Sequence, residues 1–336
     1  MARRRESGLK FGDQEKKNAK QSRKERKAEQ SGEFVMQPKK RHWGVLIAVT
    51  AVLLVAGVLV YLIARGNERL RITKVVVADA RVPEAFDGFR ILQLSDFNGK
   101  SFGEGNRTLI ETVAAEDFDI AVLTGDYIAP GGNLDSFEPV ARLVEALTER
   151  GKPVYYVLGE NDARKPEKAP DGWNRCIEQG DSPVAQKLDE LGAQCVYPIT
   201  VIERGGARIF LTGITYYEKL FDSFSFDSDK DFSICVTHAP IDYDVDKRLE
   251  SVNRYSFREI DFDMSISGHT LGGQYRLPLL KTLYLKGYGL FPQESYSYGL
   301  HKIQNRYSFI TAGLGVKSGF RLCDSPEIAI IELHSS

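Results

Sequence analysis

The chain has 336 residues, of which 42% are hydrophobic and 27% are charged, so it can bury a sizeable core in one large domain or two small ones. Its net charge of -1 hides two unlike parts: residues 1–42 carry 14 Lys/Arg against 6 Asp/Glu, a balance of +8, and residues 65–336 carry -9. An acidic main part is repelled by phosphate backbones, which argues against a nucleic-acid partner.

Residues 1–42 form a basic tail that is almost free of large apolar side chains. Such a segment cannot build a core, and we expect it to be disordered or transiently helical on the cytoplasmic side of a membrane. A solvated topology signal is the simpler interpretation. Attraction of its Lys and Arg residues to anionic lipid headgroups is the alternative.

Residues 43–64 are 22 consecutive residues without a formal charge. At about 1.5 Å per residue such a helix is about 33 Å long, enough to cross a hydrocarbon core of about 30 Å. Trp43 and Tyr61 lie near its ends, and Lys39, Lys40 and Arg41 precede it. This pattern predicts a single-pass protein of the cell membrane with a cytoplasmic N-terminus and residues 65–336 as an extracytoplasmic domain. A cleaved signal peptide is the competing interpretation, but its apolar region spans only about 7–15 residues.

After the anchor, strand-like runs alternate with segments of helical spacing. Strands are predicted at 72–77, 89–94, 120–123, 154–158, 196–202, 207–214, 232–236, 262–266, 307–311 and 327–333. Helices are predicted at 107–115, 134–150 and 182–191. The excess of strands in the second half favours an α/β (α+β) fold in which two sheets pack face to face with helices outside.

Four cysteines in a chain of this length do not form a disulfide framework. Cys235 lies within an apolar run and is expected in the core. Cys176 and Cys195 flank the predicted helix at 182–191 and could pair outside the cell, where disulfides persist. Spacing alone leaves this pairing open.

Five apolar runs each end in a side chain that can bind a metal: Asp96, Asp126, Glu160, His238 and His269. We expect them to converge, because open α/β sheets place their ligand sites at the carboxyl ends of neighbouring strands. Singly each has another explanation, since an Asp often caps a helix and a lone His is usually an ordinary polar residue. Together they indicate a centre for a divalent metal such as Mn, Fe or Zn that activates water against a phosphate ester.

Over residues 72–333 these motifs resemble the calcineurin-like metallophosphoesterases, in particular their membrane-anchored branch. The family motifs Asp-x-His, Gly-Asp, Gly-Asn-His, His and Gly-His-x-His correspond to Asp96-Phe97-Asn98, Gly125-Asp126, Gly159-Glu160-Asn161, His238 and Gly268-His269-Thr270-Leu271. The resemblance implies a four-layer αββα sandwich of the metallophosphoesterase type, preceded here by one transmembrane helix. In active relatives it implies two metal ions.

The resemblance also shows where this chain departs from the family. The first metal of the family would use Asp96, Asp126 and two positions whose histidines are replaced here, Asn98 and Leu271. The second metal would use a set that keeps its donors: Asp126, Glu160, His238 and His269. One metal ion is therefore expected, and a second is allowed.

A further departure concerns the catalytic acid. Asn161 occupies the position of a family histidine that assists the leaving group, and Asn has no titratable proton. General acid help of about 10² to 10⁴ in rate would then be absent unless Asp162, Arg164 or a water replaces it. Asn98 would orient water or phosphate.

Two functions remain open. The first is a membrane-anchored phosphoesterase, whose substrate would be lipid-linked if the apolar segment 275–298 is exposed near the site, although core packing explains that segment more simply. Residues 163–181 and 216–231 are further candidate rims. The second function is a weak or inactive relative that binds a phosphorylated or glycan ligand, or a protein partner, at the cell surface. The sequence does not distinguish between substrates or between oligomeric states.

Overall fold

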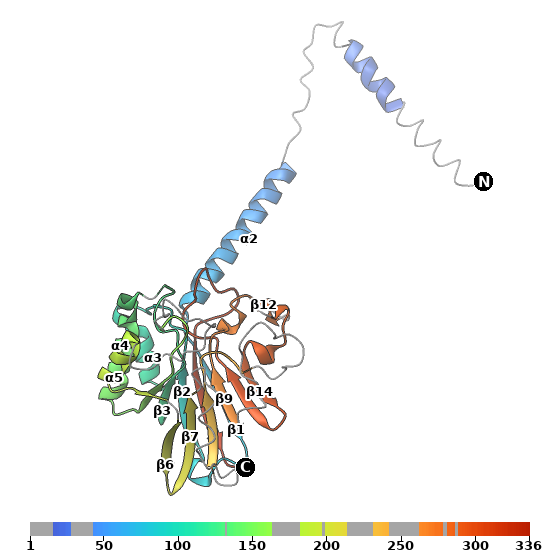
Figure 1. Ribbon diagram of the computed structural model, residues 1–336. Coiled ribbons are helices and arrows are strands. Elements are labelled where there is room, and N and C mark those ends of the chain that lie inside the picture. The colour runs from blue at the N-terminus through green and yellow to red at the C-terminus, as the bar shows by residue number, and fades with distance from the viewer. Residues whose placement is uncertain are drawn as a thin grey trace, which may run out of the picture. The chain divides into compact units, whose positions relative to one another are not determined.

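The computed structural model describes residues 16–27, 43–131, 133–162, 182–196, 199–213, 231–241, 262–277, 281–285 and 288–336 (Figure 1). The chain divides into two compact units, Met1–Gly57 and Val58–Ser336. Residues 16–27 are helical. Helix α2 (Trp43–Glu68) is long and apolar enough to cross a membrane, a test that a signal sequence also passes.

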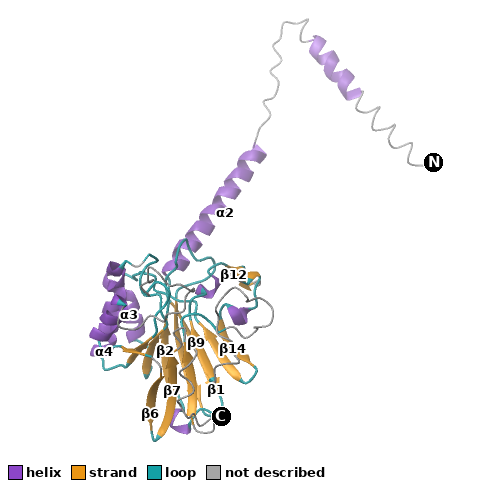
Figure 2. Cartoon of the chain, viewed as in Figure 1, coloured by secondary structure: helices purple, strands orange, loops and turns teal. Residues whose placement is uncertain are grey.

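Two six-stranded sheets form the larger unit (Figure 2). The first sheet has the order β1 (Arg71–Ala78), β16 (Glu327–His334), β2 (Phe89–Leu94), β3 (Ile120–Leu123), β4 (Val154–Tyr156), β5 (Gln194–Cys195). The second has the order β14 (Gly299–Ile303), β15 (Arg306–Ile310), β9 (Met264–Ser267), β8 (Asp231–Val236), β7 (Ala207–Gly213), β6 (Ile199–Arg204). Strands β2, β3 and β4 run parallel, as do β15, β9, β8 and β7.

Three helices pack beside the first sheet (Figure 2): α3 (Arg107–Ala114), α4 (Glu138–Glu149) and α5 (Pro183–Glu190). Ser182 starts α5 by accepting a hydrogen bond from the amide of Ala185, and Pro183 fits the first turn, which needs no amide donor. Short 3-10 turns occur at Glu84–Phe86, Glu104–Asn106, Leu134–Phe137, Leu271–Gly273 and Glu294–Tyr296.

The first sheet buries both of its faces. Along β16, Ile328 and Ile330 belong to the core shared with the helices, whereas Ala329 and Ile331 belong to the core shared with the second sheet. This alternation is the period of two expected of a strand covered on both sides. The predicted mixed fold with two stacked sheets is confirmed. Residues 214–230 and 242–261, which connect strands of the second sheet, lie outside the described residues.

Most predicted elements are found within one or two residues of their expected bounds. The predicted strand at 196–202 corresponds to β6, which begins three residues later at Ile199 and pairs with β7 in the second sheet. The segment 275–298 contains two small hairpins, Arg276–Leu277 with Lys281–Thr282 and β12 (Tyr284–Leu285) with β13 (Gly289–Leu290). It is only partly core: Leu285 is buried, while Leu290 and Phe291 are 69% and 54% exposed.

Two other predictions concern the cysteines and the rims. Cys235 is buried in β8, as expected. Cys195 is described but Cys176 is not, so their pairing remains a prediction. The candidate rim 163–181 lies outside the described residues, and so does the rim 216–231 except for Asp231, which begins β8.

Candidate metal centre

The five metal-binding residues expected from the sequence follow the carboxyl ends of five strands. Asp96 follows β2, Asp126 follows β3 and Glu160 follows β4, all in the first sheet; His238 and His269 follow β8 and β9 in the second. The two sheet edges are joined directly, because the amide of His269 donates to Oδ2 of Asp96 over 2.9 Å. Loops from both sheets therefore meet at one edge of the sandwich.

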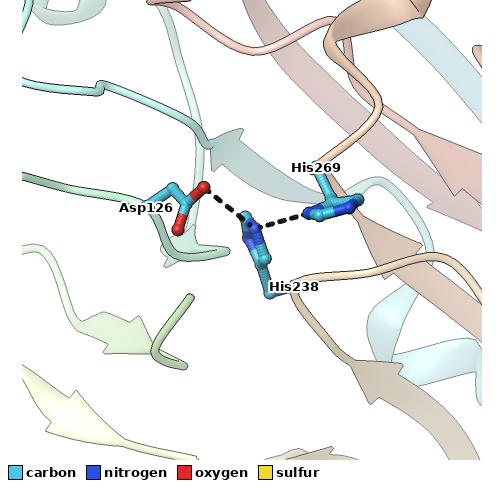
Figure 3. A group of neighbouring side chains, drawn as sticks. All are labelled: Asp126, His238 and His269. Carbon is cyan, nitrogen blue, oxygen red and sulfur yellow. Dashed lines mark hydrogen bonds and ion pairs between the residues drawn. The ribbon is translucent and has the colours of Figure 1, made fainter. Parts of the chain in front are cut away.

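Asp126, His238 and His269 form the centre of this site (Figure 3). Nε2 of His238 lies 3.3 Å from Oδ2 of Asp126 and 3.1 Å from Nδ1 of His269. One ligand atom from each residue lies within 4.8 Å of the other two. Donors that share one ion at about 2.0–2.2 Å are separated by roughly 3.3 Å, so the three side chains fit a single divalent cation.

The ring of His238 is oriented by a backbone carbonyl. Its Nδ1 lies 2.7 Å from the carbonyl oxygen of Thr124, which can only accept a hydrogen bond, so Nδ1 is the donor. Nε2 is then the atom directed at Asp126 and His269. Metal-binding histidines are commonly oriented in this way by a partner on the other ring nitrogen.

Asp96 supplies a further sign that this edge of the sandwich suits a cation. Its Oδ2 accepts hydrogen bonds from Oγ of Ser95 at 2.7 Å and from the amide of His269. Its Oδ1 is buried without a hydrogen-bond partner among the described residues. Burial of an unpaired carboxylate oxygen is costly, and a bound cation would remove that cost.

The charged groups around Asp126 shift one another's pKa. Burial alone would raise the pKa of Asp126, but His238 and Lys317 outweigh it and hold that pKa well below its usual range. Burial lowers the pKa of His238, whereas Asp126 and Asp96 together raise it to about 10. For Asp96, burial is the larger effect and raises the pKa. A metal ion would therefore have to displace a proton from His238 before binding its Nε2.

The loops hold these side chains in a sparsely populated backbone conformation. Five non-glycine residues at this edge have positive φ: Asp96 (53°), Asn98 (48°), Asp126 (57°), His269 (69°) and Leu271 (55°). Each such residue typically costs about 1–3 kcal/mol, and clusters of them mark functional sites. Close packing also requires glycine, since a Cβ on Gly125 (φ 89°) would lie 2.5 Å from the amide nitrogen of Gly159.

Lys317 is a site residue that the sequence interpretation missed. Its Nζ lies 3.0 Å from Oδ2 of Asp126 and 3.5 Å from Oε2 of Glu160. Glu160 is exposed and stands apart from the cluster of Asp126 with the two histidines. The available signal was topological: Lys317 follows β15, which runs parallel to β9 and so ends at the same edge. We call His238 and His269 the histidine side of Asp126, and Asn98, Leu271 and Lys317 its lysine side.

The residues considered for catalysis lie in different surroundings. Oδ1 of Asn98 accepts a hydrogen bond from Nδ2 of Asn161 at 3.0 Å, and Nδ2 of Asn98 donates to the carbonyl of Asp96. The buried Asp162 carboxylate accepts hydrogen bonds from four backbone amides, those of residues 126, 127, 128 and 159. Asp162 thus fixes the loop that carries Asp126, which is the role of a positioning residue. Arg164 lies outside the described residues.

A buried arginine supports the lysine side from behind. The guanidinium of Arg321 donates to the carbonyls of Leu271, Ala312, Gly313 and Gly315 and to Oδ2 of Asp324. Its backbone is bonded to the end of α2: Nδ2 of Asn67 donates to the Arg321 carbonyl at 3.0 Å, and the Arg321 amide donates to Oδ1 of Asn67 at 2.8 Å. The site loops and the last turn of α2 thus share one support.

The chain is similar in sequence to known phosphoesterases. The chain is 25% identical over 279 residues to the uncharacterized metallophosphoesterase YkuE of Bacillus subtilis (strain 168), covering 79% of this chain and 85% of that protein. It is 36% identical over 78 residues to the phosphodiesterase YaeI of Escherichia coli (strain K12), covering 23% of this chain and 27% of that protein. Among solved structures, Yfce, a phosphoesterase from E. coli, matches with a TM-score of 0.33 and 16% identity, over 69% of this chain and 83% of that one.

The family assignment rests on the part of the chain that carries all five strand-end motifs. Residues 89–273, more than half of the chain, match the calcineurin-like phosphoesterases. All five metal-binding residues predicted from the sequence lie within this range. The chain therefore belongs to the calcineurin-like phosphoesterase family.

Proposed function

We propose that this protein is a membrane-anchored, metal-dependent phosphoesterase that hydrolyses a phosphate ester at the outer membrane surface and uses one well-formed metal site. The observation that carries the proposal is the cluster of Asp126, His238 and His269, whose ligand atoms lie within 4.8 Å of one another. The unpaired Oδ1 of Asp96 at the same edge supports it.

The residues of the chain would divide the work as follows. Asp126, His238 and His269 would hold the divalent ion, and the Thr124 carbonyl would keep His238 correctly oriented. A bound ion of this kind polarises a phosphoryl oxygen and makes water a better nucleophile at neutral pH. Asn98 lies beside the cluster, where its side chain would help to orient water or phosphate. Because Asn161 cannot donate a proton as an acid, water would protonate the leaving group.

The contacts at the end of α2 favour the proposal that the substrate lies at the membrane. The apolar side chains of α2 are largely exposed, as lipid contact requires, and the preceding Lys39–Arg41 favour a cytoplasmic N-terminus. Asn67, in the last turn of α2, binds the backbone of Arg321. The neighbouring Phe320 is 43% exposed and contacts Tyr275 edge to face.

Exposed apolar residues continue from there. The amide of Leu283 donates to the carbonyl of Tyr275, and the amide of Phe291 donates to the carbonyl of Leu283. This connects Phe320 to the β12–β13 hairpin, with its exposed Tyr284, Leu290 and Phe291. Such a surface beside a membrane helix suits an amphiphilic or lipid-linked phosphate ester.

A second function, a binding module with little or no turnover, is favoured by the lysine side. Leu271 is buried and has no donor for a metal, and Asn98 and Asn161 are hydrogen-bonded to each other. A protein with these replacements would retain a phosphorylated or glycan ligand, or a protein partner, without hydrolysing it.

The two functions are separated by one set of measurements on the full-length protein in detergent. We would measure bound Mn, Fe and Zn by mass spectrometry and assay phosphomonoesters and phosphodiesters. Asp126→Asn would be compared with Asp117→Asn, which changes an exposed carboxylate on the surface. If the protein is an enzyme, we expect about one ion per chain. Asp126→Asn should then lose the ion and more than about 100-fold of the activity, because removal of a metal ligand has a larger effect than removal of a group that only orients a ligand.

Bound metal without turnover on any ester would favour the binding module. A metal-free protein that hydrolyses nothing in any added cation would contradict the phosphoesterase. A protease-protection test on intact cells checks the topology, and protection of the large domain would contradict an extracytoplasmic location.

A further inference from the structure

The two sides of Asp126 bring different kinds of positive charge to the same oxygen. Oδ2 of Asp126 lies 3.3 Å from Nε2 of His238 on the histidine side and 3.0 Å from Nζ of Lys317 on the lysine side. In a two-metal phosphoesterase this position would supply the ligand shared by both ions. Here the ammonium of Lys317 lies against the carboxylate oxygen that the two ions would share.

We propose that Lys317 replaces one of the two metal ions of the family and that its ammonium binds the phosphoryl group of the substrate. This inference rests on the proposed function and names the phosphate-binding residue of that site. It explains why the lysine side lost its histidines: a fixed cation there needs a carboxylate partner and no nitrogen ligands.

The lysine side does not fit a metal ion. Leu271 is 5% exposed, and its side chain has no atom that can bind a metal. The amide group of Asn98 is occupied on both ends, by Asn161 and by the carbonyl of Asp96. Any ion bound there would also lie close to the Lys317 ammonium, and that repulsion is strong in a partly buried site.

The loop before Lys317 is held through its backbone, and the side chain of Lys317 reaches the surface. The preceding loop is bonded to the first motif, with the Leu314 amide donating to the Ser95 carbonyl at 2.9 Å and the Gly315 amide to the Asp96 carbonyl at 2.6 Å. The side chain of Lys317 is 30% exposed, so its ammonium faces both Asp126 and the solvent from which a ligand arrives.

The chemistry suits a phosphoryl group. An ammonium is a compact charge with three donors; Lys317 directs part of this charge to Asp126 and Glu160 and keeps donor capacity for a ligand oxygen. It would retain all its protons throughout. Hydrolysis then needs only water, which adds to phosphorus while the ester oxygen leaves with a proton from water.

The first test measures phosphate binding without turnover. Inorganic phosphate is titrated calorimetrically into the full-length, Mn²⁺-loaded protein, in Lys317→Met and in Lys74→Met as a matched control. Lys74 also forms an ion pair, with Glu116, but is 65% exposed on β1. We expect Lys317→Met to bind phosphate about 10- to 100-fold more weakly, the range of a lost hydrogen bond to a charged group, and Lys74→Met to bind it normally. If Lys317→Met bound phosphate as tightly as Lys74→Met and the wild type, the proposal would be overturned.

The second test counts metal ions. The first variant, Asn98→His/Leu271→His, places histidines at both positions but keeps Lys317, and the second variant adds Lys317→Ala. Metal analysis and Mn²⁺ electron paramagnetic resonance should find one ion in the wild type and in the first variant, and two coupled ions in the second. Two ions in the presence of Lys317, or only one after its removal in a protein with normal thermal unfolding, would contradict the replacement.

The outcomes separate this inference from the proposed function. If esters are hydrolysed with one bound ion but Lys317→Met binds phosphate normally, the phosphoesterase stands and the lysine inference fails. If no ester is hydrolysed but phosphate binding still depends on Lys317, the phosphoesterase fails and the phosphate site stands.

Discussion

The histidine side and the lysine side of Asp126 are built on equivalent loops but solve the same electrostatic problem differently. On the histidine side, the two rings would take up a cation from solution, and His238 would first have to lose a proton. On the lysine side, the cation is part of the chain and carries its own charge at neutral pH. The difference teaches that a buried carboxylate demands a positive charge without dictating whether a metal or a side chain provides it.

Removal of a histidine should have the largest effect, because it would leave the histidine side unable to hold a metal ion. His269→Ala should weaken metal binding by more than about 100-fold, because a ligand is lost rather than an outer-shell partner. Metal content after dialysis against a chelator measures the effect. His301→Ala is the control, since His301 contacts the Tyr298 carbonyl in β14 and not the cluster. If the His269 variant retained its metal, the histidine side would not be the metal site.

Removal of Arg321, which supports the loops of the lysine side, should have the next largest effect. Arg321→Met leaves the buried Asp324 with the more distant Arg71, at 3.6 Å, and Arg276, and deprives four carbonyls of their donor. We expect a loss of about 3–5 kcal/mol in the free energy of unfolding, measured in urea. Arg321→Met/Asp324→Asn should recover part of it, because the second change removes the uncompensated charge. A loss below about 1 kcal/mol would show that Arg321 is not the support.

A smaller effect is expected from the asparagine pair. Asn98→Ala removes the acceptor of the Asn161 side chain and one hydrogen bond to the Asp96 carbonyl. Each bond contributes about 1 kcal/mol, so KM or kcat should change by roughly 5- to 30-fold. Steady-state kinetics on the best ester checks this. A change beyond about 1,000-fold would mean that Asn98 acts directly on the reacting group rather than by orienting it.

The smallest effect is expected at the hydrogen bonds between the end of α2 and Arg321. Asn67→Ala removes both hydrogen bonds to the Arg321 backbone. The Arg321 amide should then exchange its hydrogen about 5- to 10-fold faster, with about 1 kcal/mol of local stabilisation lost. Hydrogen exchange followed by mass spectrometry measures this, and Asn305→Ala in the turn before β15 serves as the control. Unchanged exchange at Arg321 would show that the joint is not held by Asn67.

Much of the fold could be predicted because strands buried on both faces leave a clear sequence pattern. The uninterrupted apolar run of β3 and the apolar β16 are examples, and both were located closely. Strand β14 was missed because it lies at an edge of its sheet and contains His301 and Lys302 among its five residues. Edge strands need not be apolar on either face, so periodicity does not reveal them.

The site was predictable as far as strand ends define it. Asp126, His238 and His269 were expected to meet because they end neighbouring strands, and the structure brings them together. Glu160 also ends a strand, yet its side chain points to Lys317, a choice that depends on a partner from a distant loop. Lys317 could not be singled out because lysines are usually solvated surface residues. Only the parallel pairing of β15 with β9 places its loop at the same edge.

The double hydrogen bond between Asn67 and Arg321 has a mechanical consequence. A domain joined to its anchor by a long flexible linker can take many orientations. Here the last turn of α2 is hydrogen-bonded to Arg321, the residue that supports the site loops. If α2 crosses the bilayer as proposed, the site loops would be bonded to the turn where the helix ends, with no long linker between them. A substrate that diffuses within the membrane surface would then suit this site better than one that must be captured from solution.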